Sequence, residues 1–158
     1  MSASPVENAY DVVVIGAGPI GQTVAGRTRA AGLTVAVVEQ ELVGGECSYW
    51  GCIPSKAMLR PVVALEDARR VRGAREAVSG PVAAKSVFER RNEWVSGWDD
   101  EGQANAVKDM GAELFRGQGR LDGVRRVTVE SPNGGSLTLA ARHAVAVCTG
   151  SQPMLPEL

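Results

Sequence analysis

In the first forty residues, the pattern of apolar and polar positions predicts a strand, a turn, a helix and a second strand, in that order. Residues 10–15 form a short apolar run rich in β-branched side chains, and a glycine-rich turn, residues 16–21, comes directly after it. Apolar positions then recur at helical spacing, and a second apolar run occupies residues 34–38. This pattern predicts a β-α-β unit whose second strand ends in an acidic residue, Glu39.

The middle of the chain has helical spacing. Residues 52–65 predict one helix, which Pro61 is expected to kink because proline removes a helical hydrogen bond. Residues 85–110 predict a second helix that ends at the following glycine. Three apolar side chains of this helix are spaced for one face, which predicts packing in a core or an interface: Trp94, Val95 and Trp98.

The last third of the chain has the pattern of strands. Residues 112–115 predict a strand, and residues 124–130 and 136–139 predict a hairpin around a Pro-Asn-Gly-Gly turn. Residues 144–148 are typical of a central buried strand, in which Cys148 is expected to be an inert core thiol. The predicted fold is α/β and Rossmann-like, with a central parallel sheet and a small β-hairpin insertion.

Composition narrows the class of protein. The chain has 158 residues, 44% of them hydrophobic, and a formal net charge of -1. We expect an N-terminal tail, residues 1–9, and one domain from residue 10 to 158. Acids balance the basic run at residues 69–75, so no nucleic-acid partner is indicated, and no apolar run is long enough to span a membrane. A cytoplasmic location is expected.

The glycines of the first turn have the spacing of a dinucleotide-binding fingerprint. Gly16 allows the tight turn, Gly18 lets a pyrophosphate approach the backbone, and Gly21 lets helix and strand pack closely. Glu39 lies near the position of an acid that binds ribose hydroxyls, and its charge argues against a 2′-phosphate there. The alternative is a β-α-β unit without a ligand.

Two cysteines separated by four residues predict reversible disulfide chemistry. Cys47 precedes a glycine-containing turn, and Cys52 stands where Pro54 indicates the first turn of a helix. A helix N-terminus stabilises a thiolate, and Lys56 adds a positive charge one turn later.

Three other interpretations of the cysteine pair remain open at this point. A structural disulfide suits secreted proteins, but the first residues lack the basic and apolar regions of a signal peptide. Buried inert thiols are the second interpretation. A zinc site would need more ligands than two cysteines and the distant His143 supply, so no metal is expected. Because a dithiol exchanges two electrons readily with a flavin, the pair favours FAD as the dinucleotide.

Taken together, these motifs resemble the N-terminal part of the pyridine nucleotide-disulfide oxidoreductases, the group that contains dihydrolipoamide dehydrogenase, glutathione reductase and mercuric reductase. The resemblance extends over nearly the whole chain. It is carried by the turn at residues 16–21, Glu39, Gly44 and Gly45, Cys47 and Cys52, residues 53–56, and residues 147–151.

The resemblance implies a role for each matching residue. Cys47 would be the thiol that attacks the substrate, Cys52 would face the flavin, and Lys56 would lie beside the reactive edge of the isoalloxazine. Four further residues would contact FAD through their backbone or close its site: Gly45, Gly119, Thr149 and Gly150.

Two residues depart from the family pattern. Glu46 stands where threonine is common, and its carboxylate is expected to raise the pKa of Cys47 by like-charge repulsion. Trp50, between the cysteines, is expected to serve packing.

The resemblance also implies parts that this sequence lacks: a second glycine fingerprint for NAD(P)H, a dimerisation domain, and the histidine and glutamate that a partner subunit supplies as acid and base. We therefore expect a fragment of a homodimeric parent enzyme, which passes electrons from NAD(P)H through FAD to the cysteine pair and on to a disulfide or small-molecule substrate. The alternatives are a non-catalytic nucleotide-binding module and a fragment too incomplete to bind FAD.

Overall fold

The computed structural model describes residues 8–151, 154 and 156. These residues divide into two compact units: one contains the chain up to Gly45 and again from Asp100, and the other contains Glu46–Asp99. Residues 1–7 of the expected tail lie outside the described part. Residues 8 and 9, also expected in the tail, are instead the start of the first strand, β1 (Asn8–Ile15).

The first unit is built on a six-stranded mixed sheet in the order β3-β2-β1-β6-β5-β4. Strands β2 (Val35–Glu39), β3 (Glu113–Arg116) and the second part of β6 (Ser136–Val147) lie parallel to their neighbours around β1. Strands β4 (Gln118–Leu121) and β5 (Arg126–Glu130) form an antiparallel meander with the first part of β6. The predicted α/β, Rossmann-like fold with a small hairpin insertion is confirmed.

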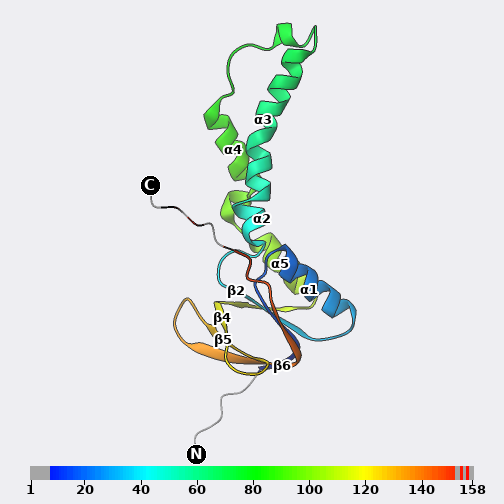
Figure 1. Ribbon diagram of the computed structural model, residues 1–158, viewed down its shortest axis with the longest axis vertical. Helices are drawn as coiled ribbons and strands as arrows, with labels where there is room; N and C mark the ends of the chain where they lie inside the picture. The colour runs from blue at the N-terminus through cyan, green and yellow to red at the C-terminus, as the bar shows by residue number, and fades with distance from the viewer. Residues whose placement is uncertain (1–7, 152–153, 155, 157–158) are drawn as a thin grey trace, which may run out of the picture. The chain divides into compact units, whose positions relative to one another are not determined.

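Alternate residues of β1 and β2 point to opposite faces of the sheet and contribute to a hydrophobic core on each face. Val12, Val14, Val35 and Val37 face a core that includes residues of α1 (Pro19–Ala30) and α5 (Glu101–Asp109). The intervening residues of β1 and β2 pack against the meander on the other face. Because both faces are buried, the strands appear in the sequence as unbroken apolar runs. Figure 1 shows α1 and α5 side by side against the strands.

The two strands predicted at residues 136–139 and 144–148 are one long strand. β6 pairs antiparallel with β5 up to Ala140 and parallel with β1 from Leu139 to Val147, with a register shift opposite Tyr10 and Val12. The expectation of a buried strand at residues 144–148 is wrong: Ala144 is exposed, Val147 is 59% exposed, and the other three residues are half-buried. These residues lie beyond Ala140, the last residue of β6 that pairs with β5, which explains their exposure.

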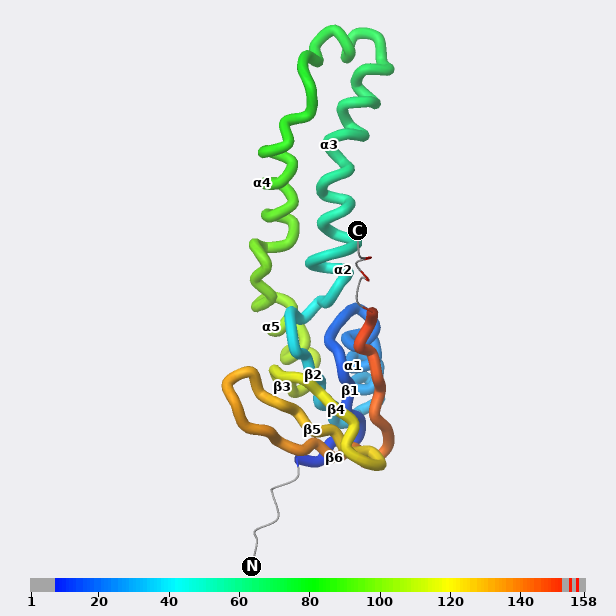
Figure 2. Tube along the Cα trace, turned by 60° about the vertical axis from the view of Figure 1, so that its left-hand side comes forward, coloured from blue at the N-terminus to red at the C-terminus, as the bar shows by residue number. Residues whose placement is uncertain are grey.

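The second unit is helical. It contains the end of α2 (Gly45–Tyr49), then α3 (Cys52–Arg70), a short 3₁₀ turn (Arg75–Ala77), α4 (Ala84–Trp94) and a second 3₁₀ turn (Ser96–Trp98). Helix α3 continues through Pro61. In Figures 1 and 2, α3 and α4 lie side by side as a helical hairpin. Within the described residues, no helix is long and apolar enough to cross a bilayer.

The single helix predicted for residues 85–110 is wrong. It is interrupted at Ser96, Gly97 and Trp98, which all have positive φ angles, so that α4 ends at Trp94 and α5 begins at Glu101. This left-handed backbone region is incompatible with continued α-helix. Of the three residues expected to form an apolar face, only Val95 is buried; Trp94 is 51% exposed and Trp98 is 36% exposed.

Candidate functional site

The glycine turn after β1 lies among the ends of three strands. The amide of Gly16 donates to the carbonyl of Val38 in β2 (2.8 Å), and the amide of Cys148, just after β6, donates to the carbonyl of Ile15 (2.7 Å). Gly16 has φ +101°, and a Cβ there would lie 2.7 Å from the carbonyl carbon of Cys148. Only glycine therefore allows the backbone to turn at this point.

Three further glycines bring backbone segments into close contact. A Cβ on Gly21 would lie 2.9 Å from the carbonyl carbon of Gly16 and closer still to its oxygen, so α1 packs directly on the turn. A Cβ on Gly45, which has φ +58°, would lie 3.0 Å from the Cα of Gly18. Gly18 itself precedes α1, whose first residue is Pro19. The open amides at this helix start are suited to a phosphate group.

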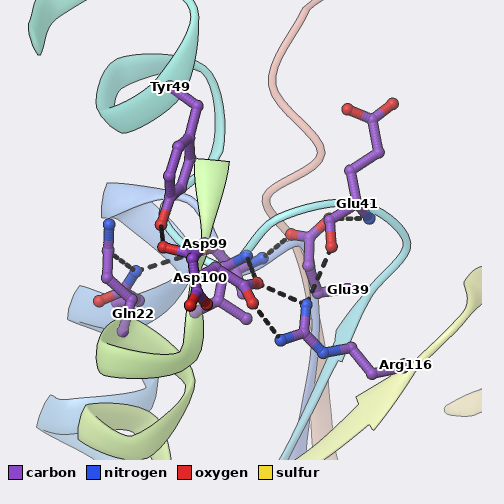
Figure 3. Close-up of polar contacts among 10 residues, drawn as sticks. Gln22, Glu39, Glu41, Tyr49, Asp99, Asp100 and Arg116 are labelled. Atoms are coloured by element: carbon purple, nitrogen blue, oxygen red, sulfur yellow. Dashed lines mark hydrogen bonds and ion pairs between the residues drawn. The ribbon is translucent and has the colours of Figure 1, made fainter. Parts of the chain in front are cut away.

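The carboxylate of Glu39 lies in the same place. Glu39 ends β2 and is 8% exposed; its Oε2 accepts from the amide of Ala17 (2.7 Å) and its Oε1 from the amide of Glu41 (2.8 Å). Figure 3 shows this carboxylate among neighbouring polar contacts. The structure thus brings Glu39 onto the glycine turn, as the spacing predicts, and its role in ribose binding stays a prediction.

The remaining predicted cofactor residues of this unit lie at the same ends of the strands. A Cβ on Gly119 in β4 would lie 3.1 Å from the Cγ2 of Ile15 and 3.2 Å from the Cγ1 of Val38. Thr149 and Gly150 are exposed and follow directly after Cys148. The first unit therefore gathers eight predicted residues: Gly16, Gly18, Gly21, Glu39, Gly45, Gly119, Thr149 and Gly150.

The cysteine pair belongs to the second unit. Cys47 lies in α2, and Cys52 is the first residue of α3, as predicted. The turn between them is closed by the amides of Trp50 and Gly51, which both donate to the carbonyl of Glu46 (3.0 and 2.6 Å). Both cysteines are free thiols in this structure.

A hydrogen bond between the two thiols is the first cause that raises the pKa of Cys47, followed by burial and by the charge of the Cys52 thiolate. The positive charge of Lys56 works in the opposite direction. The expected cause, repulsion by Glu46, is wrong: the effect comes from Cys52. Because the pKa of Cys47 is raised overall, the charge of Lys56 only partly offsets the effects of Cys52 and of burial.

Two other predictions, one in each unit, need correction. Trp50 is 45% exposed, and its ring contacts Tyr49 edge-on at 5.8 Å, so it is only partly a packing residue. Cys148 is half-buried and packs against the core cluster under α1 rather than inside it. Burial raises the pKa of the Cys148 thiol, which keeps it protonated near neutral pH.

Sequence reasoning missed a second polar cluster beside Glu39. Asp100, at the start of α5, accepts two hydrogen bonds from Arg116 at the end of β3, and Arg116 also donates to the carbonyl of Glu41 (Figure 3). These residues are far apart in the chain, and each alone resembles a surface charge. The one feature of the sequence that could have indicated this cluster is the position of Arg116 at the end of a strand. Among residues 8–151, 154 and 156, no cluster of three or more His, Cys, Asp or Glu side chains could hold a metal ion.

Comparison with known proteins gives consistent results. A family model described as pyridine nucleotide-disulphide oxidoreductase matches residues 10–158. Dihydrolipoyl dehydrogenase 3 of Pseudomonas putida is 36% identical over 148 residues, which are 92% of this chain and 31% of that protein. Dihydrolipoyl dehydrogenase of Bacillus subtilis is 33% identical over 157 residues, covering 94% of this chain and 33% of that protein.

Among solved structures, the chain is similar to the HOCl-induced flavoprotein disulfide reductase RclA from Escherichia coli, determined as a Cu(II) complex. The TM-score is 0.73 at 26% identity, and the match covers 94% of this chain and 30% of that one. The chain therefore spans about a third of the length of the curated relatives that it matches.

Proposed function

The chain belongs to the pyridine nucleotide-disulphide oxidoreductase family, and we propose that it binds FAD and carries the Cys47–Cys52 pair as the redox-active dithiol of the whole protein. The observation that carries this proposal is the pair of free thiols, Cys47 in α2 and Cys52 at the start of α3, in a chain that also builds the glycine turn and the Glu39 site.

The residues of the first unit fit a dinucleotide. The backbone at Gly18 is open, since the nearest atom to a Cβ there is 4.0 Å away, whereas Gly16 and Gly21 have no room for a side chain. In the proposal the amides at the start of α1 hold the pyrophosphate, and the Glu39 carboxylate accepts from ribose hydroxyls. When bound, FAD supplies two-electron redox chemistry.

The two thiols suit reduction of a substrate disulfide. The Cys47 thiolate attacks one sulfur of the substrate, so that one substrate thiolate leaves and a mixed disulfide forms. The Cys52 thiolate then attacks the Cys47 sulfur and releases the second substrate thiolate. The pair is oxidised by two electrons, the substrate is reduced by two, and the two thiol protons pass to the leaving sulfurs.

The raised pKa of Cys47 means that its attack requires a group that removes the proton. In the proposal Lys56 favours that step by its charge, and a base elsewhere in the whole protein accepts the proton. We extend the proposal to NAD(P)H as the source of electrons, a homodimeric whole protein, and a cytoplasmic location, where the reducing environment suits a working dithiol.

Two measurements on the purified chain test the proposal. Titration with FAD, followed by flavin fluorescence, is expected to show saturable binding that Gly18→Val abolishes. Thiol counting under denaturing conditions is expected to fall from three free thiols to one after treatment with a small disulfide, because only the pair closes internally. Cys52→Ala is expected to retain the small thiol on Cys47 instead. Three thiols that each form separate mixed disulfides would favour the non-catalytic nucleotide-binding module.

A further inference from the structure

The segment that follows β2 connects the predicted ribose acid, Glu39, to Gly45, where the chain leaves the first unit. Its residues 40–45 have no regular secondary structure until α2 begins at Gly45. Val43 and Gly44 are nevertheless buried. Because the segment has no helix or strand of its own, contacts with other elements must hold it in position.

On one side, the segment is bound to the glycine turn. The amide of Gly44 donates to the carbonyl of Ala17 (2.9 Å), and the amide of Ala17 donates to Glu39 (2.7 Å). The side-chain amide of Gln22 in α1 also donates to the Ala17 carbonyl (3.0 Å). The glycine turn and the segment therefore share one hydrogen-bond network.

On the other side, the segment is bound to Asp100 and Arg116. The Oδ2 of Asp100 accepts from the amide of Val43 (2.6 Å), and Arg116 donates to both carboxylate oxygens of Asp100 (2.6 and 2.9 Å) and to the carbonyl of Glu41 (2.9 Å). Figure 3 shows Arg116 pointing at Asp100 and at the segment. One ion pair thus fixes the backbone at two points, residues 41 and 43.

We propose that Asp100 and Arg116 are positioning residues: their bidentate ion pair holds segment 40–45 against the glycine turn, so that the dinucleotide site is formed before its ligand arrives. This inference rests on the proposed function for its ligand, FAD. The ion pair touches neither thiol and acts only through the backbone of the segment.

The local environment makes the pair suited to this role. The side chain of Asp100 is only 13% exposed, whereas that of Arg116 is 38% exposed, so solvent screens the interaction in part. Burial acts to raise the pKa of Asp100, but the Arg116 guanidinium and the Val43 amide outweigh it, and the pKa lies below its usual range. The carboxylate is therefore charged at neutral pH. A planar guanidinium can bind both carboxylate oxygens and a carbonyl together, which a lysine cannot do.

The chain contains a matched control near the start of β1, the end of that strand opposite to the glycine turn. Asp11, near the start of β1, has a side chain 16% exposed, accepts from the amide of Thr34 before β2 (2.8 Å), and pairs with Arg142 (3.2 Å). Like Asp100, its carboxylate binds an amide and an arginine; it also accepts from the Thr34 hydroxyl (2.8 Å) and lies 3.7 Å from the Nε2 of His143. It lies away from the glycine turn, so Asp11→Asn tests the loss of a comparable ion pair without the loss of the segment.

The test uses amide hydrogen exchange and FAD titration on the whole chain. Asp100→Asn is expected to speed the exchange of the Val43 and Gly44 amides and to raise the Kd for FAD, each by about 10-fold, the change that loss of one charge-assisted interaction typically causes. Exchange of the core amides of Val13 and Val37 should stay unchanged. Asp11→Asn should leave the Val43 exchange and the FAD affinity as in the wild type.

Arg116→Lys separates geometry from charge. Because lysine keeps the charge but not the bidentate contact, it is expected to restore only part of the FAD affinity lost in Arg116→Leu. Full restoration by lysine, equal FAD losses in Asp100→Asn and Asp11→Asn, or unchanged Val43 exchange in Asp100→Asn would each overturn the inference. A wild-type chain that does not bind FAD would overturn the proposed function, and the Val43 exchange would then decide whether the pair fixes the segment.

Discussion

Because α1 packs closely on the glycine turn, we expect alanine to destabilise the protein at one glycine of this helix and to stabilise it at another. Gly21 and Gly26 both lie in α1 and both have helical backbone. A Cβ on Gly21 would lie 2.9 Å from the carbonyl carbon of Gly16, whereas a Cβ on Gly26 would meet only the Sδ of Met110, at 3.9 Å. Carbon atoms in favourable contact are separated by about 3.5 to 4.0 Å. Gly21→Ala therefore forces α1 away from the turn, and Gly26→Ala fits.

The magnitudes follow from these distances. The obstacle at Gly21 is backbone rather than the end of a flexible side chain, so the substitution should cost about 1 to 3 kcal/mol as overpacking. Gly26→Ala should gain about 0.5 to 1 kcal/mol, because alanine loses less conformational entropy in a helix. At about 2 to 4 °C per kcal/mol, Gly21→Ala should lower the Tm by about 2 to 12 °C and Gly26→Ala should raise it by about 1 to 4 °C.

Thermal unfolding followed by circular dichroism measures both shifts, and FAD titration of the same samples shows whether the turn is displaced. Gly21→Ala should also weaken FAD binding, since the amides of the turn move with the helix. Equal Tm shifts for the two variants would refute the packing argument. A Gly21→Ala variant with unchanged stability and unchanged FAD affinity would refute it as well.

Three further predictions concern single side chains. Cys52→Ala removes the main cause of the raised pKa of Cys47, so alkylation of Cys47 by iodoacetamide at pH 8 should become faster; an unchanged rate would place the cause elsewhere. The Thr34 amide and hydroxyl lower the pKa of Asp11 to about 2, below its unfolded value, so Asp11 stabilises the fold above about pH 4 and this contribution is lost as the pH falls toward 2. The stability difference between wild type and Asp11→Asn in urea unfolding should shrink over that range, and a constant difference would contradict the assignment. Glu39→Gln leaves one of two backbone amides, that of Ala17 or that of Glu41, facing a donor and should cost about 1 to 3 kcal/mol in urea unfolding. The exposed Glu41→Gln should cost little, and equal costs would contradict the buried role of Glu39.

Local patterns predicted the part of the fold that positions the candidate dinucleotide site. The strand β1, the glycine turn and α1 are adjacent in sequence, and each has its own signal: an apolar run, a glycine spacing and a helical period. The start of α3 at Cys52 was likewise predictable, because Pro54 marks the first turn of a helix. The signals were reliable because short-range sterics and periodicity decide these structures.

Long-range contacts and backbone geometry were not predictable in this way. The interruption of the helix at Ser96–Trp98 has one local signal, Gly97, but the positive φ angles of Ser96 and Trp98 on either side of it have none. The continuity of β6 depends on pairing with β5 at one end and β1 at the other. The pair of Asp100 and Arg116 forms only after α5 and β3 are in place, so neither residue differs from a surface charge in sequence.

In the proposed function, one chain supplies both a flavin site and a thiol pair that exchanges electrons with the flavin. The most direct test is the visible absorption spectrum of the chain with FAD, before and after addition of one equivalent of dithiothreitol. We expect flavin bands that gain a long-wavelength shoulder in the wild type, and no shoulder in Cys52→Ala. Bound flavin whose spectrum is identical in the wild type and Cys52→Ala after reduction would contradict the claim.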